Sequence, residues 1–298
     1  MTLRVGRISY LNAIPFFHHL EQTGFSGQIV DGVPAELNAR LAAGEIDLSP
    51  SSSFEYALHW HDYLLLPGFS ISSFGPVHSV LLFSCLPLTA VGQGEIVLTG
   101  ESATSVNLLK VLLQEFCGVH RVLCRIADGP VEAVIAAGGS ALLIGDRALR
   151  AARNLPEGMQ VYDLGELWKH YTGLPFVFAL WIVRRAAYAA RQGEIQRFCR
   201  QLGQSLKLAF ADLSGTAAAV TPGGPLSAEE LVAYWQAVSY QLTPAHLDGL
   251  RRFFALCVKH DLLPEGPELL FVDQERFQRR EEFGVRGGGC EMSPAARR

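Results

Sequence analysis

The first 185 residues alternate between apolar runs of strand length and segments whose apolar positions have helical spacing. Apolar runs at 2–9 and 46–50 predict strands. The segments at 15–22 and 33–47 predict helices, the second of which ends at Gly44. Regular alternation of strand and helix is typical of α/β proteins with largely parallel sheets. We therefore expect an α/β fold.

A second unit of the same kind begins near Leu86. Residues 95–116 have the pattern of a strand, a polar turn and a helix, 141–149 contain an apolar strand, and 162–185 end in a long one. From Arg185 onward the pattern becomes helical. This order predicts that the second unit is inserted into the first.

An insertion makes the chain cross twice between two lobes, here near 83–90 and 178–185. Two lobes joined by two crossings form a clamshell whose cleft can close on a ligand. The segment 63–84 predicts two further strands of the first lobe. The expected division is residues 1–85 and 181–278 for lobe 1, 86–180 for lobe 2, and 279–298 for a charged, Gly-rich tail that we expect to be disordered.

Composition narrows the class of protein. The 298 residues are 49% hydrophobic and 18% charged, and no uninterrupted apolar run approaches the ~18 residues of a membrane span. The N-terminus lacks the pattern of a signal peptide, so we expect a cytoplasmic protein. A formal charge of −4 provides no electrostatic footprint for nucleic acid or an anionic membrane. The sequence does not indicate an oligomeric state.

Cysteine and histidine spacing does not favour a metal site or a disulfide. The chain has no CxxC pair and no HExxH motif. Adjacent histidines such as His18 and His19 point apart on a helix. The cysteines lie mostly among apolar residues, as small buried hydrophobes do: Cys85, Cys117, Cys124, Cys199, Cys257 and Cys290.

Four turns rich in hydroxyl and amide groups share one design. They are "SYLNAIP" at 9–15, "SPSSSFEY" at 49–56, "SSFGPVHSV" at 72–80 and "TGESATSVN" at 99–107. Each follows an apolar strand, and at least three lead into a helix. Ligands of open α/β sheets bind beyond the carboxyl ends of strands, where helix N-termini attract anions. The turns therefore favour a cleft for a small, anionic, polar molecule.

Ordinary helix capping remains an alternative for each turn, because Ser and Thr cap helices in all classes of protein. The best single candidate for carboxylate binding is the last turn, with Ser102, Thr104 and Ser105. Glu55 and Glu101 fit a role as complements of the helix dipole.

Motifs of nucleophilic or phosphate chemistry are absent from the sequence. There is no G-x-S-x-G, no GxGxxG after a strand and no P-loop. Asp146 in "LIGDRAL" can cap the following helix or face the cleft.

Taken together, these segments resemble the MqnA family, the chorismate dehydratases of the futalosine route to menaquinone. The most specific blocks are "GRISYLN" at 6–12, "ISSFGPVHSV" at 71–80 and "ESATS" at 101–105. The resemblance covers nearly everything but the tail. It implies that the protein has a type 2 periplasmic-binding-protein fold. It also implies an enzyme that converts chorismate to 3-[(1-carboxyvinyl)oxy]benzoate and water, with no metal or organic cofactor.

The resemblance also assigns roles to residues. Asn12 would hydrogen-bond the substrate near the reacting centre, and Ser79 would orient it or assist departure of the C4 hydroxyl. A strong side-chain base is not obvious, and in this family the enolpyruvyl carboxylate of the substrate is a plausible base. The structural alternatives are a turn-stabilising amide for Asn12 and a bond to its own strand for Ser79. His78 fills a free position of its block.

Further candidates for substrate binding come from both lobes. Ser51 and Ser52 on one lobe, and Thr104 and Ser105 on the other, would hold carboxylates. The remaining candidates are Ser9, Tyr10, Ser102 and Asp146.

Two other functions stay open at this point. One is a non-catalytic binding protein of the same fold for an anionic metabolite, which a signal peptide or lipobox would favour. The other is a sister menaquinone enzyme of the same fold, against which "SYLN" argues.

Overall fold

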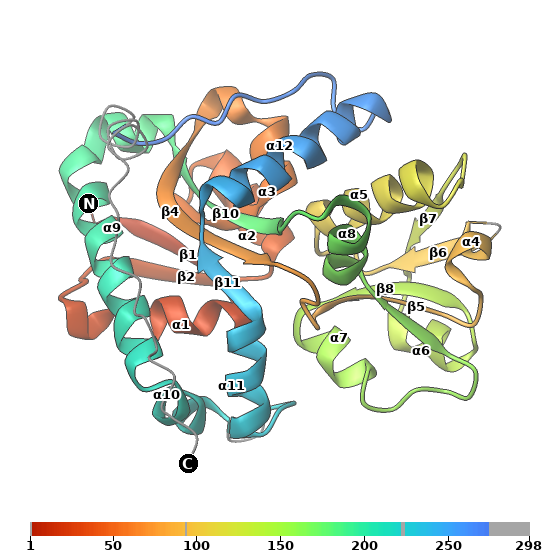
Figure 1. Ribbon diagram of the computed structural model, residues 1–298. Coiled ribbons are helices and arrows are strands. Elements are labelled where there is room, and N and C mark those ends of the chain that lie inside the picture. Colours follow the sequence, from red (N-terminus) through yellow and green to blue (C-terminus); the bar gives the residue numbers. More distant parts are fainter. Residues whose placement is uncertain (1, 93, 222–223, 274–298) are drawn as a thin grey trace, which may run out of the picture.

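Two β-sheets lie side by side in the computed structural model, each covered by helices (Figure 1). The structure describes residues 2–92, 94–221 and 224–273. We call the six-stranded sheet with its helices lobe 1 and the five-stranded sheet with its helices lobe 2. The predicted tail at 279–298 lies outside the described residues. The two-sheet architecture confirms the α/β class.

The sheet of lobe 1 has the strand order β11-β4-β10-β3-β1-β2. Strand β1 pairs in parallel with β2 and β3, whereas β10 runs antiparallel between β3 and β4. The strands are β1 Arg4–Ile8, β2 Gln28–Gly32, β3 Leu48–Ser52, β4 Tyr63–Ser73, β10 Phe176–Arg184 and β11 Val238–Gln241.

The sheet of lobe 2 has the order β7-β6-β8-β5-β9. Strand β6 is parallel to β7 and β8, and β5 is antiparallel to β8 and β9. The strands are β5 Val80–Ser84, β6 Glu95–Leu98, β7 Leu123–Ile126, β8 Ser140–Ile144 and β9 Gln160–Asp163.

The expectation of largely parallel sheets is wrong, because both sheets are mixed. Strands β5 and β10 are the first that the chain forms after each crossing between lobes, and both run antiparallel to their neighbours. Each of these strands enters its sheet from the other lobe and not through a crossover within one sheet, which is the connection that joins parallel strands.

The crossings occur earlier in the chain than the sequence suggested. The first comprises residues 74–79, and the second includes α8 and ends at 175. Strand β5 was expected in lobe 1 but belongs to the sheet of lobe 2. Residues 176–180 of β10 were expected in lobe 2 but belong to the sheet of lobe 1. The Gly/Pro/Ser turn at 72–80 resembles a hairpin, but it is the first crossing.

One carboxylate ties the two crossings together. Asp163 accepts hydrogen bonds from the backbone N–H groups of Val77 at 3.0 Å, His78 at 2.7 Å and Gly165 at 2.9 Å. His78 has a φ of 61°, which is uncommon for a residue other than glycine. Because this turn leads directly into Ser79, the Asp163 contacts also fix where Ser79 lies.

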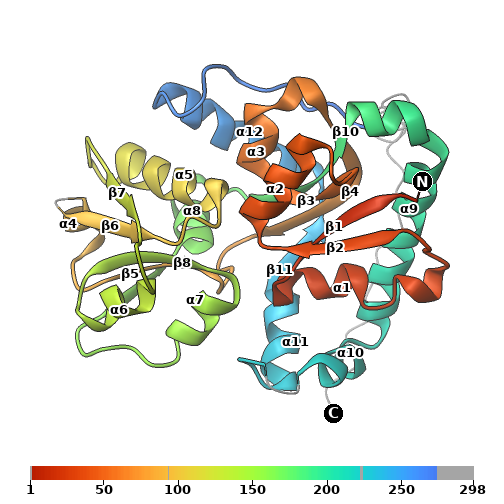
Figure 2. The same ribbon diagram turned by 180° about the vertical axis from the view of Figure 1, so that it is seen from behind.

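Helices cover both faces of the lobe 1 sheet. Figure 2 shows α2 and α3 on one side of β1 and β2, and α1 on the other. Short helical turns lie at Leu11–Ala13, Glu21–Thr23, Trp60–Asp62 and Leu112–Phe116. The α-helices are α1 Ile14–Phe17, α2 Pro34–Ala43, α3 Ser53–Leu58, α4 Leu88–Val91, α5 Ala103–Val111, α6 Val131–Ala136, α7 Gly145–Ala151, α8 Leu164–Thr172, α9 Arg185–Ala211, α10 Leu213–Val220, α11 Ala228–Ala237 and α12 Pro244–Lys259.

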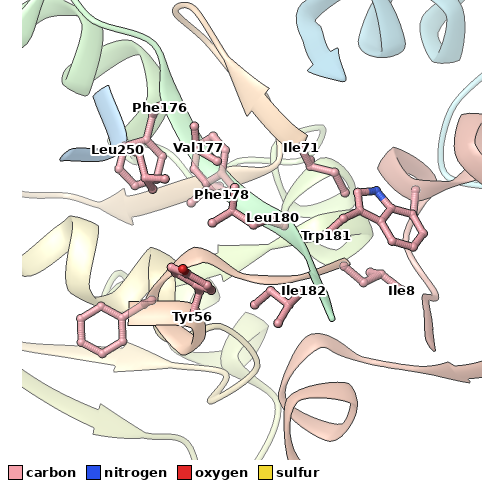
Figure 3. Close-up of a cluster of buried hydrophobic side chains, with 14 of the residues drawn as sticks. Ile8, Tyr56, Ile71, Phe176, Val177, Phe178, Leu180, Trp181, Ile182 and Leu250 are labelled. Carbon is pink, nitrogen blue, oxygen red and sulfur yellow. The ribbon is translucent and has the colours of Figure 1, made fainter. Parts of the chain in front are cut away.

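The core of lobe 1 centres on β10. Residues 176–183 of this strand are buried without interruption, because the strand is central in the sheet and covered on both faces. Figure 3 shows Trp181 and Phe176 among the buried side chains around it. The ring of Phe16 meets Trp181 edge to face at 5.4 Å between centroids. The apolar run that suggested a strand is thus the centre of the sheet.

Within the described residues, no helix is long and apolar enough to span a membrane.

Candidate active site

A small cavity of about 50 Å³ lies where the two lobes meet. Part of its wall is the edge of the apolar core, with Ile8, Ile71 and Phe178, which Figure 3 also labels. The polar residues that line it are Tyr10, Asn12, Ser52, Ser79, Ser102 and Ser105. All of these are candidates from the sequence, and they come from all four hydroxyl-rich turns. The structure therefore brings the four turns together.

Three helices begin at this cavity. Ser52 is the N-cap of α3, Ser102 is the N-cap of α5, and Gly145 is the first residue of α7. The Ser102 hydroxyl accepts a hydrogen bond from the backbone N–H of Ser105 at 3.2 Å. Helix N-termini carry partial positive charge, so their convergence favours an anionic ligand. Ser102 therefore both caps α5 and lines the cavity, so capping does not exclude ligand binding at this turn.

Asn12 has an unsatisfied acceptor in the cavity. It lies in the short helical turn Leu11–Ala13 that directly follows β1. Its Oδ1 atom is buried and has no hydrogen-bond partner among the described residues. A buried acceptor without a partner costs about 1–3 kcal/mol, which a ligand hydroxyl would recover. If Asn12 stabilised its own turn through this oxygen, the oxygen would have a partner in the turn, and it has none among the described residues.

Ser79 lies at the end of the first crossing, immediately before β5. Its side chain is 1% exposed. The Ser79 hydroxyl donates to the carbonyl oxygen of Val77 at 3.3 Å and accepts from the hydroxyl of Tyr234 at 2.8 Å. Tyr234 lies on α11, far away in the sequence, and is not among the candidates from the sequence. The spacing of apolar residues in this amphipathic helix indicates only that Tyr234 is a core residue. Nothing in the sequence indicates that it contacts Ser79.

Thr104 lies behind the cavity wall. Its side chain is fully buried and its Oγ1 atom is 2.6 Å from the Ser52 hydroxyl. The backbone N–H of Phe54 also donates to Thr104 Oγ1, at 3.1 Å. Thr104 is not among the lining residues. Its hydroxyl joins the start of α5 in lobe 2 to the start of α3 in lobe 1, where we expected it to hold a carboxylate.

Tyr10 makes a second contact between the lobes. Its hydroxyl donates to Glu101 Oε2 at 2.7 Å, and Arg147 Nη1 lies 3.1 Å from Glu101 Oε1. Burial, followed by the hydrogen bond to Glu101, raises the pKa of Tyr10. Tyr10 therefore stays protonated and acts as a donor. Glu101, which we expected to complement a helix dipole, is the acceptor of this contact.

Asp146 makes a third contact between the lobes. Its Oδ1 atom accepts from the backbone N–H of Leu11 at 3.1 Å, and burial raises its pKa. The preceding Gly145 has a φ of 58°, and a Cβ atom there would lie 2.8 Å from the ring of Tyr10. Glycine at this position thus allows the first turn of lobe 1 to close against α7.

Asp146, Ser9 and Ser51 do not line the cavity. Asp146 and Ser9 line an adjoining hollow of about 570 Å³, which shares Ile8 and Tyr10 with the cavity. Ser51 is fully buried, with its hydroxyl 2.6 Å from that of Ser49. Successive side chains of a strand point to opposite faces, so only Ser52 of the Ser51–Ser52 pair faces the cavity.

The residues that line the cavity include no Asp, Glu, His, Lys or Arg. Its polar groups are hydroxyls, one carboxamide and backbone amides. Such a set can orient an anion and donate hydrogen bonds, but it offers no ordinary side-chain base. In the part of the chain that the structure describes, no cluster of three His, Cys, Asp or Glu residues could hold a metal ion.

Residues 3–259 match the sequence profile of a family described as menaquinone biosynthesis. The chain belongs to this family. A chorismate dehydratase from Thermus thermophilus is 43% identical over 197 residues, which are 61% of this chain and 69% of that relative.

Solved structures with the same architecture show the fold. A protein from Archaeoglobus fulgidus matches with a TM-score of 0.69 and 18% identity, over 88% of this chain and 98% of that one. The alkanesulfonate-binding protein SsuA from Xanthomonas axonopodis pv. citri, bound to MOPS, matches with a TM-score of 0.68 and 17% identity, over 90% and 96%. The fold is therefore that of periplasmic binding proteins, as the sequence resemblance implied.

Proposed function

We propose that this chain is a chorismate dehydratase of menaquinone biosynthesis, which converts chorismate to 3-[(1-carboxyvinyl)oxy]benzoate and water. The family match and the 43% identical dehydratase support this activity. The observation that carries the proposal is the cavity itself. Asn12, Ser79 and the N-termini of two helices line it, and none of its lining residues has a carboxylate or imidazole side chain.

The reaction removes the ring hydrogen at C3 and the hydroxyl at C4. The product ring is aromatic, which makes the loss of water favourable overall. The enzyme then has to orient the substrate and manage one proton. The Asn12 carboxamide accepts from the C4 hydroxyl, and the Ser79 hydroxyl donates to the same oxygen as the C–O bond breaks.

The proton from C3 goes to the enolpyruvyl carboxylate of the substrate. The family resemblance implies this assignment, and the lining supports it, because it holds no side chain with a carboxylate or imidazole. The carboxylate lies on the substituent attached to C3, so it can reach that hydrogen. The carboxylate then passes this proton to the departing hydroxide, which leaves as water.

The two carboxylates of the substrate are held at the helix starts. The N-terminus of α5 offers the hydroxyls of Ser102 and Ser105, together with the positive end of the helix. Ser52 contributes from lobe 1. This division places one lobe at each end of the substrate.

Substrate binding requires the lobes to separate. A cavity of about 50 Å³ holds one or two water molecules, whereas small-molecule pockets have about 300–1,000 Å³. The contacts that must break include those of Tyr10 with Glu101, Leu11 with Asp146, Ser52 with Thr104 and Tyr234 with Ser79. Their re-formation would enclose the substrate and exclude water.

The test is incubation of the purified protein with chorismate, followed by mass spectrometry and ultraviolet absorbance. We expect a product lighter by one water and with an aromatic spectrum. Without an enzymatic base, kcat/KM should stay level between about pH 6 and 8. Binding of chorismate without turnover would instead support a non-catalytic binding protein.

Ser79→Ala and Ser205→Ala make a matched pair for this assay. Ser205 is also a fully buried serine, but it lies on α9 and does not line the cavity. Only Ser79→Ala should lower the rate of turnover. Equal rates for the two variants would remove Ser79 from the mechanism and leave the overall activity standing.

A further inference from the structure

Tyr234 is a buried residue outside the four hydroxyl-rich turns that nevertheless reaches the candidate active site. It lies on α11, and its side chain is 4% exposed. Its hydroxyl is 2.8 Å from Ser79 Oγ. Ser79 precedes the first strand of the lobe 2 sheet, whereas α11 leads into β11 of the lobe 1 sheet. The contact therefore fixes the Ser79 hydroxyl from the opposite lobe.

The direction of the hydrogen bonds determines what Ser79 can do. Tyr234 donates to Ser79 Oγ, so one lone pair of that oxygen is occupied. The proton of Ser79 points to the carbonyl oxygen of Val77 at 3.3 Å, which is long for an O–H···O bond. Rotation about the Cβ–Oγ bond can redirect this proton into the cavity. A hydroxyl that accepts one hydrogen bond is also polarised to donate a stronger one.

Tyr234 is suited to donate and not to exchange its proton. Burial raises the pKa of Tyr234, and the negative charges of Asp146 and Asp163 raise it further. Asn12 and Ser79 act in the opposite direction as hydrogen-bond partners, but the pKa remains above its ordinary value. The phenol is therefore protonated throughout the physiological pH range.

The next residue of α11 supports the other half of the site. Trp235 Nε1 donates to the carbonyl oxygen of Leu11 at 2.8 Å. Leu11 begins the helical turn that carries Asn12. Two successive residues of one helix thus hold the two turns that present Ser79 and Asn12.

We propose that Tyr234 is a positioning residue that holds the Ser79 hydroxyl as a hydrogen-bond donor to the departing C4 hydroxyl. This inference rests on the dehydratase activity proposed above. Tyr234 does not line the cavity, so it acts through Ser79 and not on the substrate. The leaving oxygen receives its hydrogen bond from Ser79, whose own oxygen is stabilised by the phenol.

Tyr240→Phe is the matched control for Tyr234→Phe. Tyr240 is another completely buried tyrosine, on the neighbouring strand β11, and its hydroxyl has no hydrogen-bond partner among the described residues. Both substitutions remove one buried hydroxyl and keep the ring. They differ in their partners: Tyr234 donates to Ser79 and also has Asn12 as a hydrogen-bond partner, whereas the Tyr240 hydroxyl has neither.

We expect Tyr234→Phe to lower kcat by about 10-fold with KM nearly unchanged, as the loss of one hydrogen bond that acts in the transition state would do. Tyr240→Phe should leave kcat unchanged. In the Ser79→Ala background, Tyr234→Phe should cause no further loss, because the group through which it acts is gone.

Three outcomes separate the proposals. If the unsubstituted protein does not turn over chorismate, the proposed function fails. If it does, and Tyr234→Phe behaves like Tyr240→Phe, the positioning role is overturned. A 10-fold loss that persists in the Ser79→Ala background would also overturn it, because Tyr234 would then act independently of Ser79. Circular dichroism of each variant checks that the fold is intact.

Discussion

Two polar clusters meet at the cavity, and they satisfy their hydrogen bonds in different ways. The helix-start cluster, Ser52 with Thr104, joins the lobes through hydroxyls that pair with each other and with the N–H of Phe54. The turn cluster consists of Asn12, Ser79 and Tyr234. There one acceptor has no partner among the described residues, and one hydroxyl is held by a long bond to a carbonyl.

We propose that this difference separates Thr104, which joins the lobes from behind the cavity wall, from Asn12 and Ser79, which act on the substrate. A fully paired hydroxyl gains little from a ligand, because an existing bond must break first. An unpaired buried acceptor gains the full hydrogen bond. On this proposal, hydroxyl-rich turns of similar sequence have different functions, according to how their hydrogen-bond partners are arranged.

The largest effect should come from the turn cluster. Asn12→Ala should lower kcat/KM by about 100-fold or more, in the range found when one polar group that contacts the reacting centre is removed. The free energy of unfolding should not fall, because the substitution removes a buried acceptor that lacks a partner. Steady-state kinetics and urea unfolding measure the two quantities. Unchanged kcat/KM would exclude Asn12 from the site.

The helix-start cluster should show the reverse pattern. Thr104→Val keeps the shape of the side chain but leaves Ser52 Oγ and the Phe54 N–H without this partner. We expect the free energy of unfolding to fall by about 1–3 kcal/mol, with a smaller loss of kcat than for Asn12→Ala.

Thr216→Val is the control for this substitution. Thr216 is similarly buried, but its hydroxyl has one long contact, 3.4 Å to His19 Nε2. Its loss of stability in urea should be smaller. A collapse of kcat in Thr104→Val, with stability intact, would reverse our assignment of the two clusters.

The smallest effect concerns Asp146, which joins the lobes beside the turn cluster. Burial raises its pKa in the folded protein, so its ionised form costs stability at neutral pH. A carboxyl group with a raised folded-state pKa stabilises the fold when it is protonated, and this contribution disappears as the pH rises through that pKa. Asp146→Asn keeps an oxygen that can accept the hydrogen bond from the Leu11 N–H, but the new side chain cannot ionise.

Asp146→Asn should therefore be somewhat more stable than the unsubstituted protein at pH 7. The advantage should shrink as acidification protonates Asp146. Urea unfolding of both proteins across an acid pH series measures the difference. An advantage that grows on acidification would contradict the sign of this shift.

Most elements and the general position of the site could be predicted from the sequence. The apolar run that became β10 and the amphipathic segment that became α2 have unambiguous patterns. The four turns also contain most of the lining residues. The resemblance in their blocks pointed to the family that the comparisons confirm.

What a turn residue faces was harder to predict. Ser51 and Ser52 look equivalent in sequence, but the alternation of a strand directs only Ser52 to the cavity. Thr104 and Ser105 are also neighbours, and only Ser105 lines the cavity. Local sequence places hydroxyls near a strand end, whereas the orientation of each one depends on the element around it.

The sequence by itself determined the α/β class, the hydrophobic centre of lobe 1 and the turns from which a site could be built, because hydrophobic periodicity and capping chemistry act over a few residues. The tertiary structure alone decided where the chain crosses between lobes, which hydroxyls pair across the cleft, and that Tyr234 contacts Ser79. Such contacts join residues up to 155 positions apart. They depend on how two sheets pack, and no local pattern records that packing.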